Sequence, residues 1–216
     1  MKNLDLVNIE KELKKRHPFP YLWFRKQNDN WDGWTNFIYQ IQDWDALNER
    51  IASVVKNHKV DRQQLFQYAA NRWYNFWSAQ AIEKIFTQIQ GIEAVHNIRD
   101  REKDFYLHEI PFDHKTSVFP RGFDHNFEFA QSNKRLLIEW LYKNQSTQKR
   151  YHLKNRLFIV VYDRKGEHWK LKAEISLIQQ EIYKYVSSFR TEELQVFKFS
   201  ENSQTCSDII WVTNGR

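Results

Sequence analysis

The sequence is poor in the residues that build disulfide frameworks, zinc clusters and flexible linkers. Its 216 residues include one cysteine, Cys206, five glycines and four prolines. A single cysteine excludes an intrachain disulfide and a zinc site of several cysteines, and it is typical of a reducing compartment. The few glycines form no glycine-rich phosphate-binding loop. No Pro/Gly/Ser-rich tract marks a linker, so we expect one folded unit.

Long apolar runs are also absent. No stretch approaches the roughly 18 apolar residues of a membrane-spanning helix. Residues 1–16 are charged throughout and lack the apolar core of a secretory signal. We therefore expect a cytoplasmic protein that does not bind membranes.

Aromatic and basic residues are what the chain has in quantity. Nine aromatic residues fall within residues 17–44, and they either fill a core, which is the commoner case, or stack on unpaired bases. The net charge is +6, which permits binding to a polyanion without demanding it. Every charged residue between Trp140 and Tyr162 is basic. This stretch is either a solvated loop or a patch that contacts phosphates.

The apolar periodicity predicts helices first and strands later. A long helix over 61–90 is expected to begin at the N-cap residue Asp61 and to end before Gly91. The other expected helices cover 4–16, 45–57, 132–144 and 169–189. The expected strands cover 94–98, 104–107, 110–118, 157–162, 194–199 and 209–213. The sequence thus predicts an α/β (α+β) fold with a mixed central sheet flanked by helices.

We expect two regions within this folded unit. Residues 1–60 form an N-terminal helical and aromatic extension, and residues 61–216 form the α/β core on which it packs. Within the core, the run LFIVVY at 157–162 predicts a central strand that is buried on both faces.

The stretch DFYLHEIPFDHKTS, residues 104–117, places three charged residues in two expected strands. If a hairpin turn is centred on its His-Glu dipeptide, residues whose numbers sum to 217 lie opposite each other. One face then collects the Phe, Leu and Ile side chains, and the other collects Asp104, Asp113 and Lys115. The turn is the weak point, because His-Glu is not the Asn-Gly type that two-residue turns prefer.

Two opposed carboxylates repel each other, and Lys115 offsets only part of this repulsion. A divalent cation would offset it better, because Mg²⁺ prefers hard oxygen ligands such as those of Asp104 and Asp113. The alternative is an exposed ion-pair cluster that contributes about 0–1 kcal/mol to stability. These residues alone leave both interpretations open.

The spacing of Asp104 and the tripeptide Asp113-His114-Lys115 resembles that of the PD-(D/E)XK nuclease superfamily. In this family an Asp ends one strand, a D-x-K or E-x-K tripeptide lies on the next, and the restriction-endonuclease-like core has the order α-β-β-β-α-β. The resemblance covers about residues 61–163. Lys103 stands where the family motif has Pro, at a position that varies widely in the family.

The resemblance implies a metal-dependent endonuclease that hydrolyses DNA phosphodiester bonds. It implies that Asp104, Asp113 and the backbone carbonyl of His114 bind one or two Mg²⁺ ions, with Mn²⁺ as a substitute. Many members add a helical Glu, for which Glu83 is the candidate here; otherwise Glu83 lies at the edge of a buried helix face and pairs with a lysine. Lys115 would orient or activate the attacking water and stabilise the transition state.

A nuclease also needs basic residues that position the DNA backbone without reading its sequence. The candidates are Arg121, Lys149, Arg150, Lys154 and Arg156. A homodimer is one option, because many nucleases of this fold dimerise to cut two strands. Two other functions stay open: a catalytically silent nucleic-acid-binding module of the same fold, and an α/β interaction module whose acidic pair is coincidental.

Overall fold

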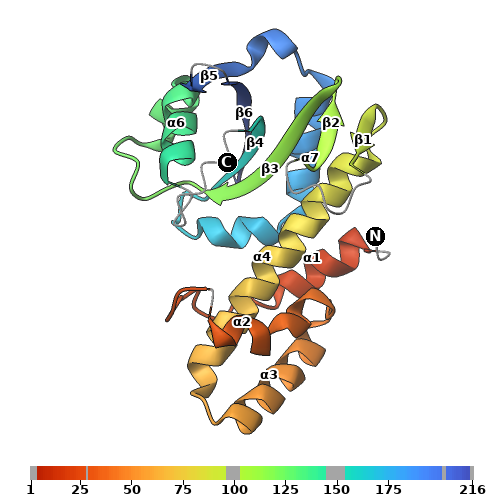
Figure 1. Ribbon diagram of the computed structural model, residues 1–216, viewed down its shortest axis with the longest axis vertical. Helices are drawn as coiled ribbons and strands as arrows, with labels where there is room; N and C mark the ends of the chain where they lie inside the picture. The colour runs from red at the N-terminus through yellow and green to blue at the C-terminus, as the bar shows by residue number, and fades with distance from the viewer. Residues whose placement is uncertain (1–3, 28, 96–102, 145–153, 201–202, 215–216) are drawn as a thin grey trace. The chain divides into compact units, whose positions relative to one another are not determined.

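The computed structural model shows a chain that divides into two compact units (Figure 1). It describes residues 4–27, 29–95, 103–144, 154–200 and 203–214. The first unit contains the chain up to Ile82 together with Lys172–Ser176, and the second contains Glu83–Leu171 and the chain from Leu177 onward. The sequence analysis placed a boundary at residue 60. In the structure the division between the units falls after Ile82, within the helix α4 (Arg62–Gln88).

The first unit is helical. Its elements are α1 (Leu6–Lys14), α2 (Asn30–Trp34), η1 (Asn36–Tyr39), α3 (Trp44–His58) and the greater part of α4. An aspartate precedes each α-helix and accepts hydrogen bonds from backbone N–H groups of the first turn; these caps are Asp5, Asp29, Asp43 and Asp61. The expected N-cap at Asp61 is therefore confirmed.

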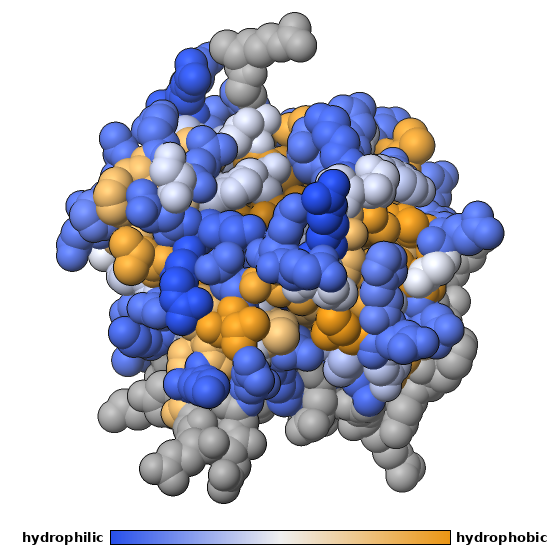
Figure 2. Space-filling view, turned by 90° about the horizontal axis from the view of Figure 1, so that it is seen from above, coloured by the Kyte–Doolittle hydropathy of each residue, from blue (hydrophilic) through white to orange (hydrophobic). Residues whose placement is uncertain are grey.

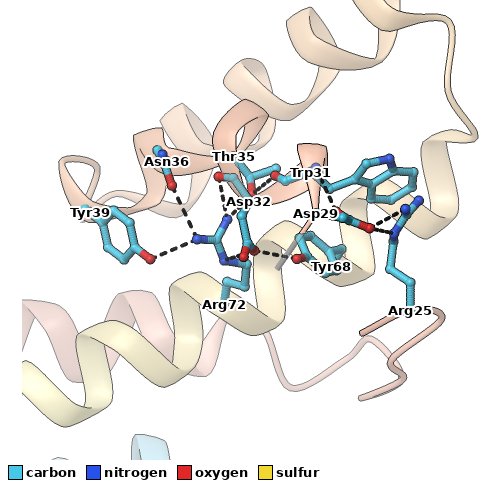
Figure 3. A network of polar contacts seen from close by, with 9 residues as sticks. All are labelled: Arg25, Asp29, Trp31, Asp32, Thr35, Asn36, Tyr39, Tyr68 and Arg72. Carbon is cyan, nitrogen blue, oxygen red and sulfur yellow. Dashed lines mark hydrogen bonds and ion pairs between the residues drawn. The ribbon is translucent and has the colours of Figure 1, made fainter. Parts of the chain in front are cut away.

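A buried guanidinium holds the irregular segment between α1 and α3 against α4 (Figure 3). Arg72 donates to the backbone oxygen of Asp32 at 2.9 Å, to the Tyr39 hydroxyl at 2.8 Å and to the Thr35 hydroxyl. The Asp32 carboxylate lies 3.3 Å from Nε of Arg72 and accepts a 2.5 Å hydrogen bond from Tyr68. This network joins α2 and η1 to α4 through residues 33 to 40 positions apart in the sequence.

The aromatic residues of this segment divide between the core and the surface. Trp31 and Trp44 are buried, as the core interpretation predicted, and the Trp44 ring packs 5.6 Å from that of Trp73. Trp23 and Phe24 remain 39% and 47% exposed. Filling of the core therefore accounts for part of the aromatic content, and not for the exposed pair.

The second unit contains a six-stranded mixed sheet in the order β1-β2-β3-β4-β6-β5. The strands are β1 (Ile92–Ala94), β2 (Phe105–Leu107), β3 (Ile110–Val118), β4 (Arg156–Tyr162), β5 (Gln195–Ser200) and β6 (Ser203–Thr213). Strands β3, β4 and β6 are mutually parallel, and the other neighbours are antiparallel. The expected mixed sheet is confirmed, and so is the burial of the central strand over Leu157–Val161.

Helices flank this sheet (Figure 1). α5 (Phe127–Ser132) and α6 (Lys134–Asn144) pack on one face, where Leu137 and Ile138 share a buried cluster with Phe158 of β4. The end of α4 covers β2, because the rings of Phe86 and Phe105 stack with centroids 4.2 Å apart. The remaining elements are η2 (His168–Ala173), α7 (Ile175–Ser187) and η3 (Thr191–Glu193). The fold is thus a mixed α/β sheet flanked by helices.

The surface is mainly hydrophilic on the face drawn in Figure 2, where apolar side chains form separate groups between charged ones. Scattered apolar residues of this kind are normal for a protein surface. None of the described helices combines the length and the apolar character that a membrane span requires.

The β2–β3 hairpin has the expected register. Phe105 pairs with Phe112 and Leu107 pairs with Ile110, so the numbers of paired residues sum to 217. The turn consists of His108 and Glu109, with φ values of 47° and 65°. A type I′ turn requires positive φ at both central residues, a conformation that costs L-residues other than Asn and Asp about 1–2 kcal/mol. The sequence therefore accepts local strain at this turn.

Replacing Glu109 by glycine should stabilise the second unit, because glycine adopts positive φ without steric cost. After allowance for the added freedom of the unfolded chain, we expect Glu109→Gly to raise the free energy of unfolding by roughly 0.5–1 kcal/mol. Gly166, with a φ of 81°, provides the matched control, and Gly166→Ala should lower stability. Urea denaturation would measure both; an unchanged or lower midpoint for Glu109→Gly would contradict the strained turn.

Candidate active site

Asp104 lies directly before β2 and completes the hairpin with its side chain. Its backbone N–H donates to the carbonyl of Phe112 at 2.8 Å. Its Oδ2 atom then accepts the backbone N–H of His114 at 2.8 Å and lies 2.6 Å from His114 Nδ1. We expected Asp104 to face Asp113 directly. Instead, its carboxylate takes the place of a backbone carbonyl and binds the residue after Asp113.

His114 is the buried partner of this carboxylate. Its side chain is 8% exposed and lies beside the ring of Phe86, on the apolar side of the hairpin as expected. Burial by itself would lower the pKa of His114, but the hydrogen bond and charge of Asp104, with the charges of Asp113 and Glu83, outweigh burial and raise it. Conversely, burial of Asp104 would raise its pKa, but His114 and Arg156 lower it. Both pKa shifts have the sign that favours a charged pair between the His114 imidazole and the Asp104 carboxylate.

The second carboxylate, Asp113, is bound by an arginine from the neighbouring strand. In the parallel pairing of β3 and β4, Asp113 lies beside Arg156. Nε and one terminal nitrogen of Arg156 approach Oδ2 of Asp113 to 2.6 and 2.5 Å. The guanidinium also lies 5.8 Å from the ring centroids of Tyr142 and Phe158. Arg156, expected as a phosphate contact, is thus also the partner of Asp113.

Lys115 lies two residues beyond Asp113 and shares its face of the sheet. Solvent reaches its side chain, and it forms no hydrogen bond or ion pair with any described residue. Surrounding atoms remove part of its hydration, which lowers its pKa; the charge of Arg156 lowers it further, and Asp113 opposes the shift. Lys115 is therefore a cation within electrostatic range of Asp113 whose ammonium group binds no described residue.

Glu83 reaches the site from the last part of α4. Its side chain is half-buried, and it lies close enough to His114 for its charge to raise the pKa of that residue. The hairpin and α4 thus bring Glu83, Asp104, Asp113 and Lys115 into one unit.

The donor atoms of the site fit a divalent cation held by few protein ligands. Among the described residues, no three His, Cys, Asp or Glu side chains form a group that could hold a metal ion. Mg²⁺ is commonly bound by one or two carboxylates, with water and phosphate oxygens completing its coordination. Asp104 and Asp113 both use Oδ2 for their internal partners, and neither Oδ1 accepts a hydrogen bond from a described residue. Each carboxylate therefore has one oxygen for a cation.

The backbone carbonyl of His114 fits the same role. The N–H of His114 points toward the Asp104 side of β3, and in a strand the carbonyl of a residue points to the same side as its N–H. In the described part of the chain β2 begins at Phe105, and no described residue pairs with β3 opposite this carbonyl. The carbonyl of His114 is therefore directed past the end of β2, beside Asp104.

The expected phosphate-binding residues are not gathered at one place. Lys154 lies directly before β4 and near Arg156, at the same end of the sheet as Asp113. Arg121 follows the opposite end of β3, and the five residue steps from Asp113 to Val118 alone span about 17 Å. Lys149 and Arg150 lie outside the described residues. Among the described candidates, Arg156 contacts a carboxylate directly, and Lys154 lies two residues before it in the chain.

Sequence reasoning missed two features. The contact between Arg156 and Asp113 had no local signal, because it depends on the register of two parallel strands 43 residues apart. A pocket of about 470 Å³ in the first unit had no recognisable motif either. Its walls include Phe19, Phe66 and Arg62.

No family model, curated protein or solved structure matches this chain. The assignment of the site consequently depends on its own geometry and on the spacing of its residues.

The contact between Asp104 and His114 predicts a measurable pKa. In an NMR titration, His114 should titrate above its unperturbed value of about 6.5, and Asp104→Asn should lower this pKa. Asn still accepts the His114 N–H, so the hairpin is retained. A His114 pKa that Asp104→Asn does not lower would contradict the ion pair.

The pKa shifts of His114 and Asp104 also predict how the stability of the fold depends on pH. A raised His114 pKa stabilises the fold fully below about pH 6.5, and this contribution is lost as the pH rises through the folded value. A lowered Asp104 pKa stabilises the fold above about pH 4, and this contribution is lost as the pH falls through the folded value. The stability difference between wild type and Asp104→Asn should therefore be largest between about pH 4 and 6.5.

Proposed function

We propose that the protein is a metal-dependent nuclease, which hydrolyses DNA phosphodiester bonds at the site formed by Asp104, Asp113 and Lys115. The observation that carries the proposal is the hairpin geometry, because it places Asp113 and Lys115 on one face of β3 and Asp104 at the adjacent strand end beside His114, while Lys115 binds no described residue. The order of α4, β1, β2, β3, α6 and β4 also corresponds to the α-β-β-β-α-β order of the restriction-endonuclease-like core. This correspondence supports the proposed PD-(D/E)XK relationship.

The carboxylate oxygens of Asp104 and Asp113, with the backbone carbonyl of His114, would hold Mg²⁺ or Mn²⁺. Such an ion, when bound, lowers the pKa of a coordinated water and neutralises charge on the scissile phosphate. Glu83 would act from the His114 side, where its negative charge supports the protonated imidazole that orients Asp104.

Lys115 would contribute in two ways. Its ammonium group is a compact point charge that can donate to a phosphate oxygen and stabilise the charge that develops during hydrolysis. Its lowered pKa also brings it closer to the range in which it can exchange a proton with the attacking water. Lys154 and Arg156 would hold neighbouring phosphates, and such contacts should weaken steeply with salt.

A second candidate function is nucleic-acid binding without cleavage. Two observations favour it: both carboxylates have cationic partners within the protein, and no group of three metal-binding side chains occurs among the described residues. Cleavage activity distinguishes the two functions.

The first test is cleavage of supercoiled plasmid and of single-stranded DNA in the presence of Mg²⁺, Mn²⁺ or EDTA. We expect metal-dependent cutting by the wild type and a loss of roughly 10²–10³-fold in rate for Lys115→Ala, because a transition-state donor is removed. Lys165→Ala, at an exposed lysine outside the site, is the matched control and should cut normally. Equal rates for Lys115→Ala and wild type would disprove the mechanism.

A further inference from the structure

The contact between Arg156 and Asp113 occupies the carboxylate to which a cation would bind. Both nitrogens of Arg156 approach the same oxygen, Oδ2, at 2.6 and 2.5 Å. The contact is partly shielded, since Arg156 and Asp113 are 14% and 25% exposed. A cation binding to Asp113 must therefore share this carboxylate with a guanidinium, and the repulsion between the two cations opposes its binding.

The surrounding structure fixes the backbone of Arg156 and leaves its side chain as the element that can move. The Arg156 carbonyl accepts a 2.7 Å hydrogen bond from Ser207, and the Asp113 N–H donates to the carbonyl of Asn155 at 3.0 Å. These bonds hold the start of β4 against both neighbouring strands. Among the described residues, the guanidinium binds one carboxylate oxygen, and it lies 5.8 Å from the ring centroids of Tyr142 and Phe158. Turning it away from Asp113 would break no backbone hydrogen bond.

The charges around Asp113 show what would draw Arg156 away. Lys115 is on the same face, and Arg156 already lowers its pKa, so the two cations repel each other across one carboxylate. A DNA phosphate would add a second anion beside Asp113, to which the Arg156 guanidinium could turn. Arginine suits such an exchange, because its planar fork binds carboxylate and phosphate with the same geometry.

We propose that Arg156 is a positioning residue that occupies Asp113 in the absence of DNA and transfers its N–H donors to a DNA phosphate when the substrate binds. This inference rests on the proposed nuclease function and adds a regulation of the same site. Release of Asp113 then strengthens cation binding, so DNA and the cation bind with positive coupling. By linkage, the coupling is equal in both directions. Without DNA, the cation binds weakly.

The test is Mn²⁺ binding to the protein without DNA, measured by electron paramagnetic resonance of the free ion. Arg156→Gln removes the competing charge and should tighten Mn²⁺ binding roughly tenfold, within the usual range of such couplings. Arg156→Lys keeps a charge but loses the fork, so it should lie between wild type and Arg156→Gln. It also serves as the second variant if Arg156→Gln does not fold.

Two controls locate the effect. Arg135→Gln, at a half-exposed arginine of α6, should leave Mn²⁺ binding unchanged. Asp113→Asn should abolish it. A parallel measurement of DNA affinity in Ca²⁺ should show weaker binding for Arg156→Gln than for wild type, because a phosphate contact is lost.

The outcomes separate this inference from the nuclease proposal. If the wild type binds Mn²⁺ and Arg156→Gln binds it equally or more weakly, the role of Arg156 as a competitor is wrong, and the nuclease proposal stands. An unchanged DNA affinity for Arg156→Gln would overturn the transfer to phosphate. If neither the wild type nor any folded variant binds Mn²⁺, both proposals fail.

Discussion

The site depends on the register of the β2–β3 hairpin, and the register depends on a two-residue turn. His108 and Glu109 both adopt positive φ, which lets the chain reverse without an extra residue. One residue more or less would turn the carboxylates toward the opposite face, because side chains alternate along a strand. With this register, Asp104 ends its strand beside His114, and Asp113 and Lys115 share one face. The strained turn thus sets the strand register that positions the charged side chains.

The parallel pairing of β3 with β4 determines the partner of the second carboxylate, Asp113. It brings Arg156 to Asp113, while Asp104 is bound by its own hairpin partner, His114. Each carboxylate has its own cation, so the repulsion expected between two opposed aspartates is relieved within the protein. This arrangement explains how the protein's own side chains offset the charge of the two aspartates. It also means that any ligand of these carboxylates must compete with the partners already present.

In the first unit, the aromatic-rich segment between α1 and α3 is held in place mainly by side chains. Two buried arginines provide many of these contacts. Arg72 binds residues of the segment from α4, and Arg16, fully buried, donates to the carbonyls of Phe19 and Pro20 and to Gln67. A buried guanidinium needs several acceptors to offset its lost hydration, and backbone carbonyls of an irregular segment supply them. The backbone carbonyls of the segment thus satisfy the buried guanidinium groups, and the guanidinium groups in turn hold the segment in place.

The sequence alone determined the order of elements, the Asp61 cap, the buried central strand and the hairpin register, because each leaves a local pattern of apolar or capping residues. The tertiary structure decided the partners of the charged groups. The contact of Arg156 with Asp113 follows from the register of parallel strands, which no turn between them sets. The Asp104 side chain binds His114 because Asp104 lies directly before the first residue of β2, Phe105. Such contacts join residues through packing, so their energies are absent from any local stretch of sequence.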